Sequence, residues 1–147
     1  MITPPPLLQF NADGSVLLNI EGRAVTLQVS PRSIAAHHWP HGTPGLLQLE
    51  LAIDEVENAI EQAGLVHGDR GVLRVSAGLR ELLPAPWRAP GTISRDDVEV
   101  AFSRLVAASG VAGPLAGLPN SGEVAAALLM VREIMHHLGF QTLDTDG

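Results

Sequence analysis

Histidine is the residue type in this sequence that could carry chemistry, because it is clustered. Three of the six histidines fall within the segment His37-His38-Trp39-Pro40-His41, and two more, His136 and His137, are adjacent. Imidazole is the commonest protein ligand for transition metals, so the two groups could meet around one ion. Adjacent helical residues point about 100° apart, so only one of the second pair would face a shared site. The spacing matches no known metal motif, and the alternative is that the first three lie on a surface loop while the pair stabilises a helix end.

Carboxylates offer a second possible metal site. Four acidic residues follow one another at spacings of four, three and four, which places them on one helix face: Glu50, Asp54, Glu57 and Glu61. A dimetal carboxylate site usually takes a Glu-x-x-His pair from each of two helices, and this sequence has one such pair, Glu133 with His136. We therefore expect the acidic ladder to be a solvated or arginine-binding face. The alternative is a metal site built from these candidates: His37, His38, His41, His136 and Glu133.

The residue types that are absent limit the possible chemistry. The sequence has no cysteine, tyrosine or lysine, which excludes disulfides, thiol nucleophiles and lysine Schiff bases. It also lacks the Gly-x-Ser-x-Gly turn of serine hydrolases and the Gly-x-Gly-x-x-Gly loop of dinucleotide-binding folds. These absences favour a non-catalytic protein over an enzyme. We expect no cofactor, with a divalent metal ion as the alternative.

Length and charge narrow the class of protein further. The chain has 147 residues, a length that fits one domain with a hydrophobic core. Its net charge of −7 argues against nucleic-acid binding, which needs a clustered basic surface. The longest apolar run, 124–131, is far shorter than the ~20 residues of a membrane-spanning helix. With no cysteine and no secretory signal, the sequence predicts a cytoplasmic protein that binds neither nucleic acid nor a membrane.

The N-terminal part of the chain predicts strands. Three apolar runs, 7–10, 16–20 and 24–29, are separated by segments rich in Asn, Asp and Gly, the residues that tight turns prefer. The third run alternates apolar and polar residues, which is the period of a half-buried strand. We therefore expect a three-stranded antiparallel meander, which 72–75 could extend to four strands.

The remainder of the chain predicts mainly helices. Apolar residues recur every three or four positions in three segments that end at a glycine: 44–63 with Thr43 as its cap, 94–110, and 120–139. The histidine-bearing segment 30–45 contains three prolines and is predicted to be a loop. A final short strand is predicted over 140–143.

These elements define the expected architecture. Strands come first and helices follow, an order that favours an α+β fold: an antiparallel β-meander of three to four strands with three main helices packed on one face. We expect a single domain over 1–147, with a flexible proline-rich tail at 1–6 and a proline-rich connector at 84–91.

The apolar content of the chain suggests self-association. Hydrophobic residues make up 46% of the chain and charged residues 17%, more apolar surface than one small core uses, and a symmetric homodimer is the commonest solution. Trp39 and Trp87 lie in proline-rich segments and could be interface anchors or could close the edge of the core. The sequence therefore favours a non-catalytic, self-associating accessory or small-ligand-binding protein, without naming the ligand or any protein partner. The alternative is a metal-binding protein or metal-dependent enzyme that uses the clustered histidines.

Overall fold

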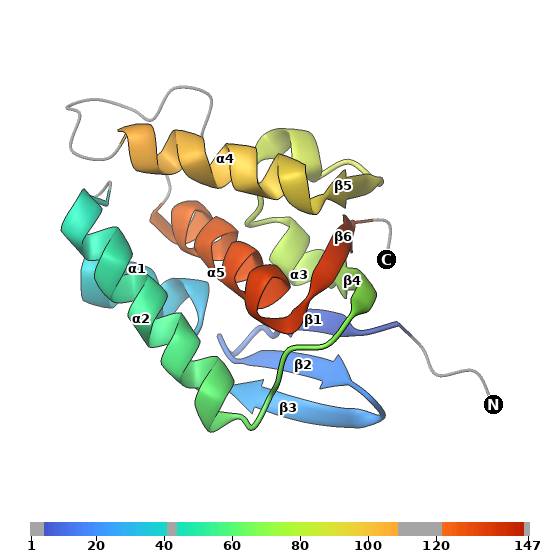
Figure 1. Cartoon of the computed structure of the whole chain (residues 1–147). Helices are drawn as coiled ribbons and strands as arrows, with labels where there is room; N and C mark the ends of the chain where they lie inside the picture. The colour runs from blue at the N-terminus through green and yellow to red at the C-terminus, as the bar shows by residue number, and fades with distance from the viewer. Residues whose placement is uncertain (1–4, 41–43, 109–121, 146–147) are drawn as a thin grey trace.

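The chain folds around a six-stranded sheet with helices packed against it (Figure 1). The computed structural model describes residues 5–40, 44–108 and 122–145. In the order of the sheet, the strands are β3 (Arg23–Leu27), β2 (Val16–Ile20), β1 (Leu7–Phe10), β4 (Arg70–Val75), β6 (Phe140–Asp144) and β5 (Thr92–Ser94).

Strands β1, β2 and β3 pair in antiparallel fashion, in the segments where the sequence pattern predicts strands. The turn between β2 and β3 has positive φ at both Glu21 (54°) and Gly22 (79°), the backbone that a two-residue type I′ hairpin requires. Alternate residues of β2, namely Val16, Leu18 and Ile20, are buried in the core. This half of the sheet therefore has one core face and one more open face.

The α+β class is confirmed, but the prediction of an antiparallel meander with three to four strands is wrong. Strand β4 does not extend the meander at β3; it pairs in parallel with β1, and β6 pairs in parallel with β4. Parallel neighbours need a crossover connection, which the helices between β3 and β4 provide. The alternation of apolar residues identifies a strand but not the direction of its partner, so the mixed sheet could not be read from β4 alone.

Five α-helices and one 3₁₀ helix are present in the described part of the chain: α1 (Pro31–His38), α2 (Leu46–Gln62), α3 (Ala77–Arg80), η1 (Ala85–Trp87), α4 (Arg95–Ala108) and α5 (Gly122–Leu138). Helices α2, α4 and α5 lie where helices are predicted, while the expected cap Thr43 and the boundaries Gly110 and Asn120 fall outside the described residues. Helix α1 replaces a predicted loop. It starts with a capping box in which the side chains of Ser30 and Ser33 bond each other's backbone N–H.

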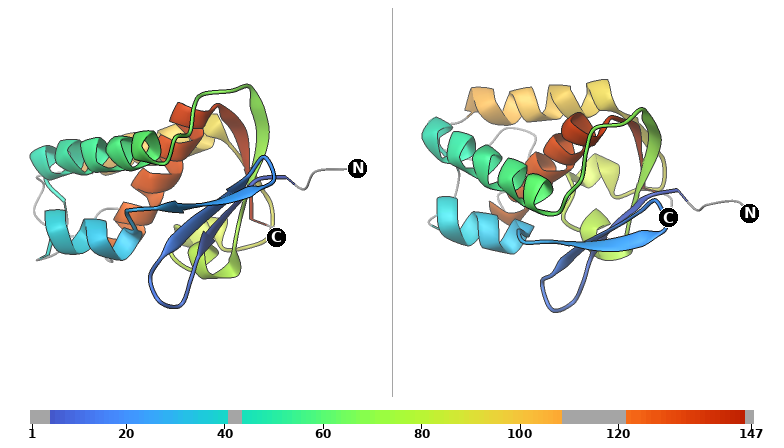
Figure 2. Two further views of the ribbon diagram at one scale, coloured as in Figure 1. Left: turned by 90° about the horizontal axis from the view of Figure 1, so that it is seen from below. Right: turned by 60° about the horizontal axis from the view of Figure 1, so that its bottom comes forward.

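Helix α5 is the central helix of the fold. It lies among the other helices and next to the sheet (Figure 2), in contact with α1, α2, α4 and β6. Twelve of its seventeen residues are buried. This explains the apolar run in its sequence, because a helix that is surrounded by other elements must be apolar on most sides. Among the described helices, none combines the length and the apolar character that a membrane crossing needs.

Candidate metal site

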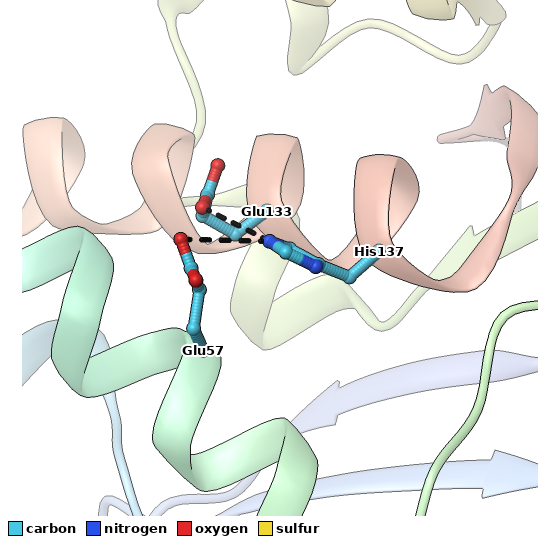
Figure 3. Close-up of side chains that lie close together, drawn as sticks. All are labelled: Glu57, Glu133 and His137. Atoms are coloured by element: carbon cyan, nitrogen blue, oxygen red, sulfur yellow. Dashed lines mark ion pairs between the residues drawn. The ribbon is translucent and has the colours of Figure 1, made fainter.

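Three side chains from α2 and α5 converge on one point between the two helices (Figure 3). Glu133 and His137 are four residues apart on α5 and therefore lie on the same helix face. His137 Nε2 lies 3.5 Å from Glu133 Oε1 and 3.6 Å from Glu57 Oε1 of α2. Within the part of the chain that the structure describes, this is the only group of three or more His, Cys, Asp or Glu side chains with this proximity.

The spacing of these ligand atoms fits a bound cation better than direct hydrogen bonds. An N–H···O hydrogen bond places its heavy atoms about 2.9–3.0 Å apart, shorter than either distance from His137. Two ligands that each lie about 2.0–2.1 Å from a tetrahedral metal are separated from one another by about 3.4 Å. The two distances from His137 are therefore close to the separation expected of ligands around one ion, and all three atoms lie within 4.8 Å of one another.

Glu133 has one carboxylate oxygen without a hydrogen-bond partner. The residue is 1% exposed, and its Oε1, the atom that faces His137, is buried with no hydrogen bond to the described residues. Leaving a buried acceptor unsatisfied costs roughly 1–3 kcal/mol, and more when the group is charged. A cation beside Oε1 would remove this penalty.

The other oxygen of Glu133 is held by Arg132. Arg132 Nη1 donates to Glu133 Oε2, while its Nε lies 3.2 Å from Glu99 Oε1 of α4. The guanidinium carbon lies 4.9 Å from the centre of the Phe102 ring, a cation–π distance. Burial alone would lower the pKa of Arg132, but the carboxylates of Glu133 and Glu99 raise it, and the net pKa lies above its ordinary value. Arg132 thus fixes the carboxylate with Oε1 turned toward His137.

The structure selects different histidines from those that the sequence suggested. Glu133 lies in the site, but His136 is exposed, and its neighbour His137 occupies the position beside Glu133. The sequence indicated that only one of this pair would face a shared site, and His136 was the residue named. Glu57 was placed in the acidic ladder but was not named as a candidate ligand. The available signal was the spacing of four residues between Glu133 and His137, which puts them on one helix face.

The first histidine cluster lies elsewhere. His37 Nδ1 and His38 Nε2, at the end of α1, lie 3.4 and 3.2 Å from Glu55 Oε1 of α2. Among the described residues no contact joins them to His136 or Glu133, and His41 lies outside the described residues. Metal binding by this cluster stays a prediction.

The two tryptophans have different environments. Trp39 is 5% exposed, lies in the core, and donates from Nε1 to the carbonyl oxygen of Gly122 at 2.8 Å. Trp87 lies in η1 and packs half-buried against the core. Both positions agree with the alternative that these side chains close the edge of the core, and an interface role stays a prediction.

Comparison with known proteins identifies the fold. No protein-family model and no curated protein matches the sequence. A Ppx/GppA enzyme of Aquifex aeolicus matches with a TM-score of 0.68 at 6% identity, over 97% of this chain and 54% of that chain. The type II variant of the Aquifex aeolicus Ppx/GppA phosphatase (TM-score 0.66, 7% identity) and an exopolyphosphatase-like protein (0.64, 10%) match over 97% of this chain and 53% and 54% of theirs. At this identity the likeness shows the fold, and the chain spans about half the length of these proteins.

The likeness corrects the main functional expectation. A non-catalytic accessory or small-ligand-binding protein is contradicted, because the solved structures that share this fold include Ppx/GppA enzymes. Self-association stays a prediction. The expectation rested on the absence of nucleophile and nucleotide-loop motifs from the sequence, with a metal site kept as the alternative. An arrangement of carboxylates and imidazole from separate helices leaves no contiguous motif. The alternative of a metal-dependent enzyme agrees better with the fold.

Proposed function

We propose that this chain is a metal-dependent phosphohydrolase domain in which Glu57, Glu133 and His137 bind a divalent transition-metal ion. The observation that carries the proposal is the buried Oε1 of Glu133, which has no hydrogen-bond partner and faces two further potential ligands. The phosphohydrolase part rests on the fold, since the solved neighbours include a Ppx/GppA phosphatase and an exopolyphosphatase-like protein.

The donor set favours particular metals. Two carboxylates suit Mn²⁺ and Mg²⁺, whereas imidazole suits Zn²⁺ and Fe²⁺, so the mixed set favours Mn²⁺, Fe²⁺ or Zn²⁺ over Mg²⁺ or Ca²⁺. Three protein ligands leave a coordination position for water or a substrate oxygen. The Glu57 and His137 side chains are 42% and 35% exposed, so the site is open on the side away from Glu133. A divalent metal bound in such an open site can lower the pKa of a bound water or polarise a phosphoryl oxygen.

The chain is shorter than the solved proteins that share its fold. It covers 52–54% of the solved Ppx/GppA and exopolyphosphatase-like chains. We therefore propose that additional residues, supplied by further polypeptide or by a partner chain, strengthen substrate binding, while this chain alone retains slow metal-dependent hydrolysis. The substrate class would be phosphate esters or phosphoanhydrides.

A hydrolysis assay with matched variants tests the phosphohydrolase proposal. Metal-free protein is reconstituted with Mn²⁺, Fe²⁺ or Zn²⁺, and phosphate release is measured from p-nitrophenyl phosphate and from inorganic polyphosphate. We expect metal-dependent release that His137→Ala abolishes and His136→Ala retains, because only His137 lies at the ligand cluster. Equal release by the two variants, or no release with any metal, would contradict the proposed activity.

A further inference from the structure

A hollow of about 470 Å³ lies on the more open face of the sheet, within the size range of small-ligand pockets. Four strands contribute to it through residues that pair directly across the sheet: Ala24 of β3 with Asn19 of β2, Asn19 with Leu7 of β1, and Leu7 with Arg74 of β4. Directly paired residues point to the same face, so these four side chains form one row. Arg23, the first residue of β3, pairs with Ile20 and lies outside this row, at the end of the hollow next to the β2–β3 turn. We call the whole site the arginine hollow.

The walls of the arginine hollow are fixed by hydrogen bonds. On one side, Arg70 Nη2 pairs with Glu21 Oε1 of the β2–β3 turn at 2.8 Å, and Arg70 Nη1 donates to the carbonyl oxygen of Leu138 at 2.6 Å. On the other side, Arg74 Nη2 donates to the carbonyl oxygen of Pro5 at 2.9 Å. The shape of the hollow is therefore set before any ligand binds, which reduces the entropy lost on binding.

The charge of the hollow differs from that of the whole chain. The chain carries a net charge of −7, yet Arg23 and Arg74 line this hollow, and its one carboxylate, Glu21, is already paired with Arg70. Arg23 has no hydrogen bond or ion pair with any described residue. Arg74 Nε is buried without a hydrogen-bond partner, so the protein does not use all the donors of this guanidinium. Asp144 lies beside Arg74 in β6 but is not part of the lining.

We propose that the arginine hollow binds a small organic anion, a carboxylate or a phosphoryl group attached to an apolar body. Guanidinium groups bind such oxyanions through paired N–H donors. The Asn19 amide offers further donors, and Leu7 and Ala24 provide an apolar floor. This second site shares no residue with the metal site, so it stands whether or not the cluster at Glu133 binds metal.

An NMR titration of the purified protein tests the anion site. Benzoate and phenylphosphonate serve as the carboxylate and phosphoryl probes, and benzyl alcohol is their neutral counterpart. We expect amide shifts to cluster at Ile20, Gly22 and Ala24, with little effect from benzyl alcohol. The stronger of the two anions identifies the preferred head group. Shifts that are scattered over the molecule, or no shifts at probe concentrations on the order of 10 mM, would overturn the proposal.

Variants locate the binding energy within the hollow. A charge-assisted hydrogen bond is worth enough for Arg74→Gln to weaken binding about tenfold, and Arg23→Gln should weaken it several-fold. Arg23 is exposed at the turn, so this variant keeps the test decisive if Arg74→Gln fails to fold. Arg104→Gln, an exposed position on α4, should bind as the unmodified protein does. Equal affinity in all three variants would overturn the proposal.

Discussion

Glu133 is 1% exposed, and each of its two carboxylate oxygens faces a different neighbour. Oε2 accepts from Arg132, whereas Oε1 faces His137 and Glu57 without a hydrogen bond. Burying a carboxylate is unfavourable unless it is paired, so this position is maintained by the charges around it. The same arrangement that stabilises the buried carboxylate leaves one oxygen available to a metal ion.

Removing the guanidinium of Arg132, which pairs with Glu133, should therefore destabilise the fold. We expect Arg132→Gln to lower the free energy of unfolding by about 2–3 kcal/mol, because it leaves a buried carboxylate without its partner. Glu99→Gln removes a half-exposed partner of the same arginine and should lower it by less than about 1 kcal/mol. Urea denaturation of both variants measures the difference. Losses of equal size would show that the Glu133 pair has no special weight.

At the residue scale, the sequence pointed to the two helices of the candidate site but did not group Glu57, Glu133 and His137. Glu133 was a candidate because of its Glu-x-x-His spacing to His136. In the structure, α5 turns Glu133 and His137 toward α2 and leaves His136 exposed. The orientation of α5 is set by the burial of Ile134, Met135 and Leu138, which the positions of the histidines in the sequence do not reveal. Glu57 was one of four equivalent acids in the ladder. Only the packing of α2 against α5 distinguishes it.

The connection between α5 and β6 is a tight junction of one residue, Gly139, close to the candidate site. Gly139 has φ +82°, and a Cβ there would collide with the carbonyl oxygen of Gly68. The same junction is bonded to the first residue of β4, where Arg70 N donates to the Gly139 carbonyl oxygen at 3.0 Å. The end of α5, which carries His137, is therefore positioned by a glycine that permits close approach of two backbones.

Two glycine substitutions separate this close approach from backbone strain. Gly64→Ala has φ +74° but no neighbouring atom within 4 Å, so it should cost about 1–2 kcal/mol from the left-handed backbone alone. Gly139→Ala adds a backbone collision and should cost about 1–3 kcal/mol more. Thermal or urea unfolding of the two variants tests this order. Equal destabilisation would mean that the junction relaxes easily.

Element prediction succeeded where a local pattern fixes the structure. Helix α4 begins as expected, with the Ser94 side chain accepting from Asp97 N at 3.1 Å, and Ile93 and Val98 are both buried. Helix α1 was missed because its capping box pairs Ser30 with Ser33 in place of the usual Glu or Gln. The three-residue β5 was missed because Thr92–Ser94 is too short to show a period and also caps a helix. Such elements depend on tertiary pairing, which no local pattern records.

At the scale of the whole molecule, the charge agrees with a cation site. Acidic residues outnumber arginines by sixteen to nine, and the exposed Glu50, Asp54 and Glu61 of α2 are on the same helix as Glu57. A negative surface raises the local concentration of cations, which favours metal binding between α2 and α5. The fold matches about half of each solved Ppx/GppA chain, a likeness of fold that sequence identity of 6–8% does not disclose.

Calorimetric titration of metal-free protein with Mn²⁺ and with Zn²⁺ tests the central claim most directly. We expect about one ion per chain for the unmodified protein and for His136→Ala, with binding lost in His137→Ala and strongly weakened in Glu57→Gln, because the proposed site includes His137 and Glu57 but not His136. Binding that survives in His137→Ala, or its absence from the unmodified protein, would contradict a metal site at Glu57, Glu133 and His137. The cluster would then be a proton-bridged ion pair between α2 and α5.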